Sequence, residues 1–223
     1  MKKSKKTPLP PRIEEIAGIA LGRMTSPLMP DTDYEAIRFN GEPAAELNWR
    51  GLQFQDSSIA LSETDNLVLQ KARVIGTIFE MGTINLLDAH DSRWRESRIS
   101  NGKIVSGNFS GSLLSSVHIR DLRVGYINFI QADISDVLFE NCRFDTIDFA
   151  GSKINRVSFN SCYVNEIDLR EVKSENLNLS GLEFQSLDGS DGLRNCYLSS
   201  NQLIQLSSAF ARELGIKVLD IPI

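Results

Sequence analysis

Apolar residues recur every five positions along most of this chain. Steps of five from Trp49 to Phe184 give 28 centre positions, and 26 of them are apolar, with Thr64 and Ser174 as the exceptions. No charged residue occupies a centre or the position two residues before it. Because the chain as a whole is only 41% hydrophobic, this regularity indicates a repeat architecture rather than a single globular core.

The five-residue period predicts a solenoid. Two inward positions in every five suit neither an α-helix, with its period of about 3.6, nor a flat strand, with its period of 2. A chain that turns a corner after each block keeps both positions inside, and four sides make one coil of about 20 residues. Residues 20 apart then lie above one another, so Phe109, Phe129 and Phe149 should form one column. The repeats predict about seven such coils around a filled core.

These blocks resemble those of the pentapeptide-repeat family, whose loose motif is A(D/N)LXX. Between Asn141 and Val164, for example, the chain reads NCRFD, TIDFA, GSKIN, RVSFN, SCYVN. The resemblance covers about 140 of the 223 residues. It implies an all-β, right-handed quadrilateral β-helix with an N-terminal cap or helix and a capping α-helix at the C-terminus. It implies much less about function, because most members of the family have no assigned function.

The chain divides into four expected segments. Residues 1–11 form a disordered, basic and Pro-rich tail. Residues 12–43 form an N-terminal helix and capping segment, and residues 44–185 form the solenoid. Residues 186–223 form a turn-rich break, a capping helix and a tail.

An amphipathic helix is predicted from Arg12 to Met24, because apolar residues there follow helical spacing. They are Ile13, Ile16, Ala17, Ala20 and Leu21. We expect residues 12–40 to fold back over the side of the first coils or to cover their open end. That side would present Leu61, Val68, Ile75, Ile78, Met81 and Leu86 at outward positions. In an alternative interpretation, this apolar patch binds a partner instead.

A second helix is predicted to begin after Ser199, which stands with Gln202 at capping-box spacing. It runs to about Leu214, and Gly215 ends it. Its apolar stripe is Leu203, Leu206, Phe210 and Leu214. The last coil needs a cover, and the family resemblance implies that such a helix also forms a head-to-head dimer. These four residues are therefore candidates for the cap and for a homodimer contact.

Charge and hydropathy favour a cytoplasmic protein without a membrane anchor. The net charge is −5, and no apolar run is long enough for a transmembrane helix. The basic start at Lys2 to Lys6 is followed by prolines rather than by the apolar core of an export signal. We interpret it as a solvated tail rather than a tether to nucleic acid or membrane.

Residues that could carry catalysis are few, and we expect no enzyme activity, cofactor or metal. His90 beside Asp91 could pair as a base and its orienting carboxylate, but no nucleophile is identifiable, and His118 is likewise interpreted as an exposed structural residue. Cys142 and Cys162 lie one coil apart, and reduced core thiols are favoured over a disulfide or metal pair. Gly-rich phosphate-binding motifs are absent from the sequence.

Charged side chains provide the candidate interaction surface. Three basic residues, Lys103, Arg123 and Arg143, recur at intervals of twenty and should share one side. Acidic residues gather at Asp133, Asp136, Glu140, Asp145 and Asp148. Sides of the rod with opposite charge could bind partners. In the alternative interpretation, these sides carry mixed charges that only contact solvent.

We therefore predict a non-enzymatic, rigid protein-interaction scaffold whose protein partner the sequence does not identify. The family resemblance implies an alternative, a DNA mimic that binds DNA gyrase or another type II topoisomerase. Such a role requires continuous negative potential along one face. The basic residues argue against it on one side, and the acidic group permits it on another. Direct binding to nucleic acid is not expected, because the net charge is negative and the aromatic residues are internal.

Overall fold

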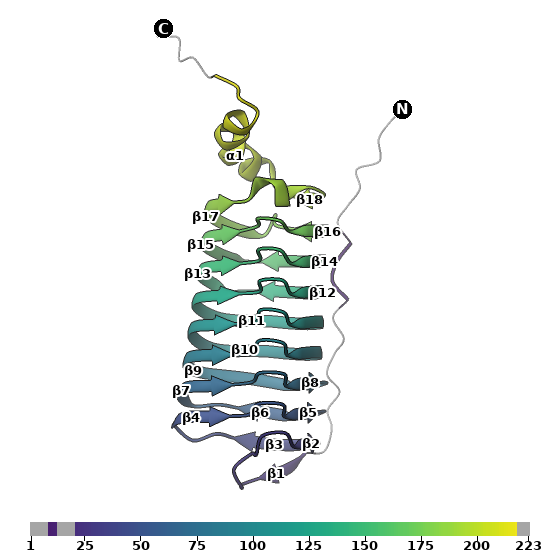
Figure 1. Ribbon diagram of the computed structural model, residues 1–223, viewed down its shortest axis with the longest axis vertical. Helices are drawn as coiled ribbons and strands as arrows, with labels where there is room; N and C mark the ends of the chain where they lie inside the picture. Colours follow the sequence, from purple (N-terminus) through teal and green to yellow (C-terminus); the bar gives the residue numbers. More distant parts are fainter. Residues whose placement is uncertain (1–8, 13–20, 218–223) are drawn as a thin grey trace.

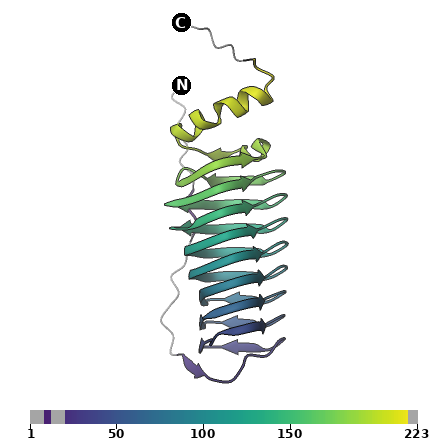
Figure 2. The ribbon, with the colours of Figure 1, turned by 90° about the vertical axis from the view of Figure 1, so that its left-hand side faces the viewer.

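The chain folds into a rod of stacked coils, with an α-helix at its C-terminal end (Figure 1). The structure is a computed structural model, and it describes residues 9–12 and 21–217. The 18 strands of these residues form one sheet in which the pairings are parallel. Figure 2 shows the coils stacked edge to edge along the rod. The predicted fold class, a parallel β-solenoid with a C-terminal helix, is confirmed, with about eight turns rather than seven.

The first strands are β1 (Gly22–Met24), β2 (Asp33–Glu35), β3 (Ile37–Asn40), β4 (Ala44–Asn48), β5 (Gln53–Gln55), β6 (Ser58–Ala60), β7 (Glu63–Val68), β8 (Arg73–Ile75) and β9 (Ile78–Asp88). They are followed by β10 (Arg93–Asn108), β11 (Leu113–Asn128), β12 (Asp133–Glu140), β13 (Arg143–Asp148), β14 (Lys153–Asn160), β15 (Cys162–Asp168), β16 (Lys173–Asn178), β17 (Leu182–Asp188) and β18 (Cys196–Tyr197). A 3-10 helix, η1 (Ser190–Leu193), precedes β18, and helix α1 (Ser200–Glu213) follows it.

Aromatic side chains stack along the core, as the twenty-residue register predicts. Phe109 and Phe129 lie in one column with ring centroids 5.3 Å apart, and Phe129 and Phe149 continue it with the same spacing. A second pair, Phe139 and Phe159, stacks at 4.7 Å and 8°. All these rings are buried, and each contributes about 1.5–3 kcal/mol of transfer free energy before entropy is subtracted.

Most corners of the rod are made by residues in the left-handed backbone region, but the corner of Leu86 and Tyr126 is not. One corner carries a β-turn in every coil, such as the turn closed by the Ala132 N–H bond to Phe129 O at 3.0 Å. The third residue of this turn, Gln131, has φ 56°, which a type II turn requires. Gly151 occupies the same corner with φ 68°, a conformation that glycine adopts without a steric penalty.

The solenoid begins earlier than the predicted boundary at residue 44. Strands β2 and β3 pair in register with β5 and β6, and Gly22 of β1 pairs with Ile37 of β3. The helix predicted over Arg12 to Met24 is therefore wrong at its end, because Gly22–Met24 form a strand. Residues 13–20, which carry most of that prediction, lie outside the described part of the chain. Of the two expected placements, residues 21–40 take the one that covers the end of the rod, where Leu28 is buried.

The apolar patch predicted on the first coils is smaller than expected. Leu61 and Met81 point inward and are 8% and 0% exposed, whereas Leu86 is 56% exposed. At this corner the left-handed residue is Gly82 rather than residue 81, so the inward position is shifted by one. The Met81 side chain lies next to Gly102 of the following coil. A Cβ added to Gly102 would lie only 2.7 Å from Met81 Cβ, so glycine at position 102 leaves room for the methionine.

Helix α1 closes the last coil through both polar and apolar contacts. The capping box is present, since Ser199 Oγ accepts from the Gln202 backbone and Gln202 Oε1 accepts from the Ser199 backbone. The buried Gln202 amide also donates to Leu179 O at 2.8 Å and to Leu182 O at 2.7 Å. One side chain therefore starts the helix and satisfies carbonyl groups of the terminal coil.

Replacing Phe129 with alanine should lower the free energy of unfolding by about 3–5 kcal/mol, because it opens a cavity between two stacked rings. Leu113→Ala is the matched control, since Leu113 is 43% exposed and its loss should cost no more than about 0.5 kcal/mol. Urea unfolding followed by circular dichroism measures both. Equal destabilisation by the two substitutions would contradict the filled-core interpretation.

Candidate functional site

Asn and Asp side chains cap the turns at one corner of the rod. Asp148 Oδ1 accepts from the Ala150 backbone N–H at 2.8 Å, and Asp168 Oδ1 accepts from Arg170 N–H at 2.9 Å. Short side chains with an acceptor two residues before the donor make this contact, which explains why Asn and Asp recur here. Asp148, one of the candidate surface residues, is thus also a structural residue.

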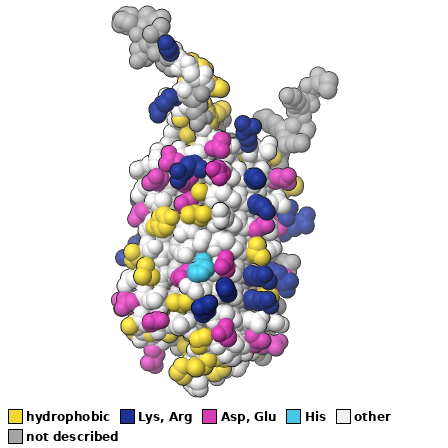
Figure 3. Space-filling view, viewed as in Figure 1, with side chains coloured by type: hydrophobic (Ala, Val, Ile, Leu, Met, Phe, Trp, Pro, Cys, Tyr) yellow, Lys and Arg dark blue, Asp and Glu magenta, His cyan; other side chains and the backbone are white. Residues whose placement is uncertain are grey.

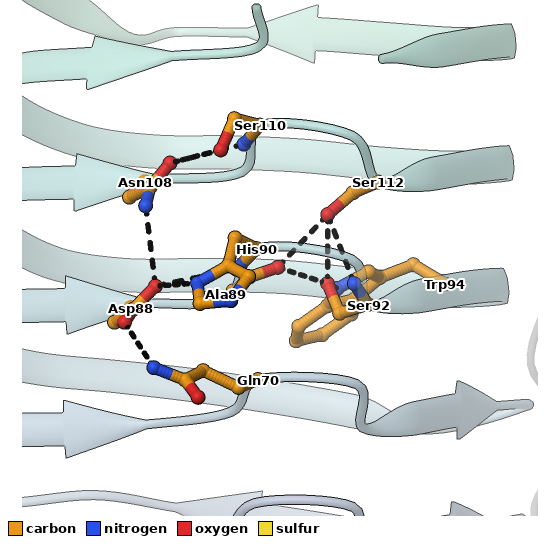
Figure 4. Close-up of polar contacts among 9 residues, drawn as sticks. All are labelled: Gln70, Asp88, Ala89, His90, Ser92, Trp94, Asn108, Ser110 and Ser112. Carbon is orange, nitrogen blue, oxygen red and sulfur yellow. Dashed lines mark hydrogen bonds and ion pairs between the residues drawn. The ribbon is translucent and has the colours of Figure 1, made fainter. Parts of the chain in front are cut away.

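Asp88 is the centre of a polar network that joins three coils (Figure 4). Gln70 Nε2 donates to Asp88 Oδ2 at 2.6 Å, and Asn108 Nδ2 donates to Oδ1 at 3.2 Å. His90 Nδ1 lies 2.7 Å from the same Oδ1. Partial burial raises the pKa of the Asp88 carboxyl, but the hydrogen bonds from Gln70 and His90 outweigh it and leave the pKa lowered. The network ties coils together along their outer surface.

His90 therefore pairs with Asp88 and not with Asp91, the partner considered from the sequence. The Ser110 hydroxyl donates to Asn108 Oδ1 at 2.8 Å, and the hydroxyls of Ser92 and Ser112 donate to Ala89 O (Figure 4). The pair consequently lacks an aligned nucleophile among the residues drawn. Its geometry is that of a coil-to-coil contact rather than of a catalytic triad.

A second polar ladder lies inside the rod beside this network. Ser92 Oγ and Ser112 Oγ are 3.1 Å apart, and Trp94 Nε1 donates to Ser92 Oγ at 2.8 Å (Figure 4). Both hydroxyls also donate to Ala89 O. Because these buried groups are all hydrogen-bonded, Ser92 and Ser112 fill the narrow inner column without leaving an unpaired polar group.

His118 is more buried than the sequence predicts, with 14% of its side chain exposed. Its Nε2 lies 3.1 Å from Glu140 Oε2. Desolvation lowers the pKa of His118, and Arg120 and Arg98 lower it further, whereas Glu140 only partly offsets this effect. Glu140, a candidate surface residue, also accepts from Asn160 Nδ2 at 3.1 Å and is engaged within the rod.

The five acidic candidates do not form one surface. They fall within a single coil and are spread around its circumference, as consecutive sides of a solenoid must be. Asp133 aligns with Lys153 on one side, Asp145 accepts from Asn165 Nδ2 on another, and Asp148 belongs to the turn column. Figure 3 shows acidic and basic side chains interspersed over the visible face.

Asp136 is buried at a corner and anchors the N-terminal segment. Arg156 Nε donates to Asp136 Oδ1 at 2.6 Å, and the Arg12 backbone N–H donates to the same oxygen at 3.0 Å. Ser116 Oγ donates to Arg12 O at 2.6 Å. Residues 9–12 thus lie along the side of the rod near β12 and β14 (Figure 1). The sequence alone carries no signal for this contact.

The basic candidates, by contrast, form the column that the sequence predicts. Lys103 aligns with Arg123, and Arg123 aligns with Arg143 in adjacent coils. All three are exposed, and none forms an ion pair with another described residue. The guanidinium of Arg143 lies 4.4 Å from the centre of the Tyr163 ring, which holds one end of this basic column in place.

A shallow groove runs beside the basic column. Gly125 lacks a side chain at its outward position, between Val105 and Asp145 of the flanking coils, and the groove is lined by all three basic residues. Val105 is 47% exposed, and Leu86 and Tyr126 at the neighbouring corner are 56% and 37% exposed. We name this apolar group the Val105 strip. Sequence reasoning placed Leu86 outward but missed Val105 and Tyr126, because the apolar residues of this group do not recur at steps of twenty.

The four candidate residues of helix α1 separate into two groups. Leu206 is buried, and Phe210 is partly buried against the core, so these two belong to the cap. Leu203 and Leu214 are 54% and 77% exposed. The homodimer predicted through this helix stays a prediction, and only the outer residues remain open to such a contact.

The cysteines contribute packing. Cys142 and Cys162 are free, buried thiols that contact the backbone oxygens of Glu140 at 3.2 Å and Asn160 at 3.3 Å respectively. The hydrogen bond with Cys162 and burial raise the pKa of the Cys142 thiol. Among the described residues, no group of three His, Cys, Asp or Glu side chains is placed to hold a metal. Nor does this part of the chain contain a helix long and apolar enough to cross a membrane.

No protein-family model matches the chain, and no curated protein matches it either. Among solved structures, it is similar to QnrB1, a plasmid-mediated fluoroquinolone resistance protein, with 13% identity and a TM-score of 0.36 over 89% of this chain and 96% of that one. It is also similar to HetL, a pentapeptide repeat protein involved in heterocyst differentiation regulation from the cyanobacterium Nostoc sp. strain PCC 7120. There the identity is 13% and the TM-score 0.33, over 77% and 89% of the two chains. Likenesses this weak carry no functional argument.

Asp136→Asn should destabilise the rod by about 2–3 kcal/mol, because it weakens a charge-assisted pair between the buried Asp136 and the partly buried Arg156. The hydrogen bond from Arg156 lowers the pKa of Asp136 in the folded protein and outweighs its burial. This carboxylate therefore stabilises the fold above its unfolded pKa of about 3.9, and the stabilisation is lost as the pH falls below that value.

The difference between the wild-type protein and Asp136→Asn in chemical unfolding should therefore shrink below about pH 3.9. Asp133→Asn is the control, since Asp133 is exposed, and it should change stability by no more than about 0.5 kcal/mol. A difference that stays constant across this pH range would show that Asp136 does not act through its charge.

Proposed function

We propose that this chain is a pentapeptide-repeat protein that acts without catalysis, as a rigid scaffold whose outer columns bind another protein. The single observation that carries this proposal is the exposed basic column beside the Val105 strip, which forms no ion pair with the residues that the structure describes. Elsewhere, many charged side chains are used for coil-to-coil contacts, such as Asp136 with Arg156. Among the described residues, Lys103, Arg123 and Arg143 form no such ion pair, and Arg143 contacts the ring of Tyr163 instead.

The filled core supports a surface function. The column of Phe109, Phe129 and Phe149 occupies the interior, so a substrate has no cavity to enter along this part of the rod. The rod presents instead a fixed spacing of about 4.8 Å between neighbouring side chains of one column. This rigidity favours recognition, because little conformational entropy is lost when a partner binds. The proposal places the protein in the cytoplasm, on the sequence expectation alone.

The scaffold proposal predicts that the wild-type chain captures a protein from its native cell through the basic column. Lys103→Gln, Arg123→Gln and Arg143→Gln together should remove that capture. The matched control is Arg73→Gln, Arg93→Gln and Lys173→Gln, which deletes the same charge from exposed positions on another side and should retain it. Cross-linking followed by quantitative mass spectrometry measures both. Capture that survives the first variant would contradict the proposal.

A DNA mimic that binds DNA gyrase is the second candidate. One observation favours it: Asp148, Asp168 and Asp188 align in successive coils and form an acidic column near the C-terminal end. Against it, Asp148 and Asp168 cap turns, and Asp168 also pairs with Arg170. The negative charge is therefore partly neutralised where a mimic of phosphates would need it.

Gyrase supercoiling assays separate the two candidates. The scaffold proposal predicts that excess of this protein leaves supercoiling unchanged. A DNA mimic would inhibit the enzyme, and the variant lacking the three basic residues of the column would inhibit it more strongly because the rod is then more acidic. Inhibition that follows this order would replace the scaffold proposal with the mimic.

A further inference from the structure

We infer that the basic column and the Val105 strip bind an acidic, amphipathic α-helix of a partner protein, lying parallel to the rod axis. This inference rests on the proposed scaffold function and names the chemistry of its partner. Its starting point is the geometry of one side of the rod. There, three cations run along three successive coils, and the Val105 strip lies beside two of them, those of Lys103 and Arg123.

The spacing of the cations matches a helix better than an extended chain. Neighbouring coils are about 4.8 Å apart, so Lys103 and Arg143 are separated by roughly 9.6 Å along the axis. A helix rises about 1.5 Å per residue, so carboxylates at positions i, i+3 or i+4, and i+7 span about 10.5 Å. Alternate residues of an extended strand advance about 6.6 Å and would cover roughly 13 Å over two steps. The helix keeps all three contacts in register.

The width of this side also suits a helix. Arg123 and Gly125 lie on the same side of β11, about 6.6 Å apart along the strand. Gly125 follows Val105 in the same outward column, and its missing side chain leaves the groove open between Arg123 and Tyr126. A helix about 10 Å in diameter that lies in this groove turns one edge toward the cations and the adjoining edge toward the Val105 strip. Its apolar residues would therefore follow its acidic residues by about one position.

Carboxylates of the rod leave the basic column available. Asp121, at the adjoining corner, accepts from Arg120 Nε at 2.7 Å and from Asn141 Nδ2 at 2.6 Å, so it is already engaged. Asp145, on the same side as Arg143, accepts from Asn165. Neither forms an ion pair with the three cations. A partner's carboxylates consequently meet cations that form no ion pair among the described residues, and Arg143 is held there by the Tyr163 ring.

Acidic residues limit the length of the surface at both ends. Glu63 lies two coils before Lys103 in the same column, with Thr83 between them. Glu183 follows Arg143 by two coils, beyond Tyr163. Like charge at these positions repels an acidic segment that extends beyond the three cations. The surface therefore accommodates about two turns of acidic helix in a defined register.

A synthetic helical peptide tests the inference directly. The probe is a 14-residue peptide of about four turns with Glu at i, i+3 and i+7 and Leu on the adjoining edge. An isomeric peptide of the same composition carries its Glu residues on different faces. Fluorescence anisotropy should show that the wild-type protein binds the first peptide at least about tenfold more tightly than the isomer.

The two charge variants provide the decisive comparison. Lys103→Gln, Arg123→Gln and Arg143→Gln together should weaken binding of the first peptide by about tenfold or more. The control variant with Arg73→Gln, Arg93→Gln and Lys173→Gln should bind within about twofold of the wild-type protein. Far-ultraviolet circular dichroism of both variants shows that the fold is intact before binding is measured.

Three results would overturn the inference. They are equal binding of the two peptides, binding unaffected by the first variant, and tighter binding of a single-stranded oligothymidine than of the helical peptide. If the native-cell capture depends on the basic column while neither peptide binds, the helical partner is excluded and the scaffold proposal stands. If the helical peptide binds in solution but no protein is captured from the cell, the scaffold proposal fails. The conclusion that the basic column and the Val105 strip bind an acidic helix is then retained.

Discussion

The rod depends on the backbone hydrogen bonds between successive coils, because they hold residues twenty apart in one column. Phe129 N, for example, donates to Asp148 O at 2.7 Å, and Phe149 N donates to Asp168 O at 2.9 Å. Once this register is set, each inward residue stacks on the inward residue of the neighbouring coil, and the core consists of stacked layers of side chains. Each coil then draws its stability from its two neighbours, and no single coil is a core by itself.

A stack of this kind has two open ends and must cover them, since exposed strand edges invite aggregation. At the C-terminal end, α1 places Gln202 and Leu206 over the last coil. At the N-terminal end, strands β1 to β3 complete the stack, and Leu28 is buried there. The two ends therefore use different solutions, a capping helix at one and a shortened first coil at the other. Residues 9–12 add a third contact along the side through Asp136.

The same register determines what the outer surface can do. Any charge that recurs every twenty residues becomes a column with the spacing of the coils, whereas charges that are close in sequence are carried to different sides. Lys103, Arg123 and Arg143 are an example of the first case. Asp133 and Asp145 are an example of the second. Because the interior is filled, the rod's interactions belong to these columns, and a partner is recognised by spacing and charge together.

The sequence by itself determined the repeat, its register and the cap, because each depends on local spacing. The five-residue period fixed the column of Phe109, Phe129 and Phe149, and capping-box spacing fixed the start of α1 at Ser199. The same reasoning identified the basic column. These features could be read from one chain because every coil repeats the same local rule.

Only the tertiary structure decided the features that break this rule or connect distant segments. Met81 lies inward because one corner shifts by a residue, and Gly22–Met24 pair as a strand despite helical spacing nearby. Arg12 meets Asp136 across 124 residues of sequence, a contact that no local pattern encodes. The open groove at Gly125 likewise exists only once its flanking coils are stacked. Periodicity specifies which residues share a column, and packing decides which of them remain free to bind.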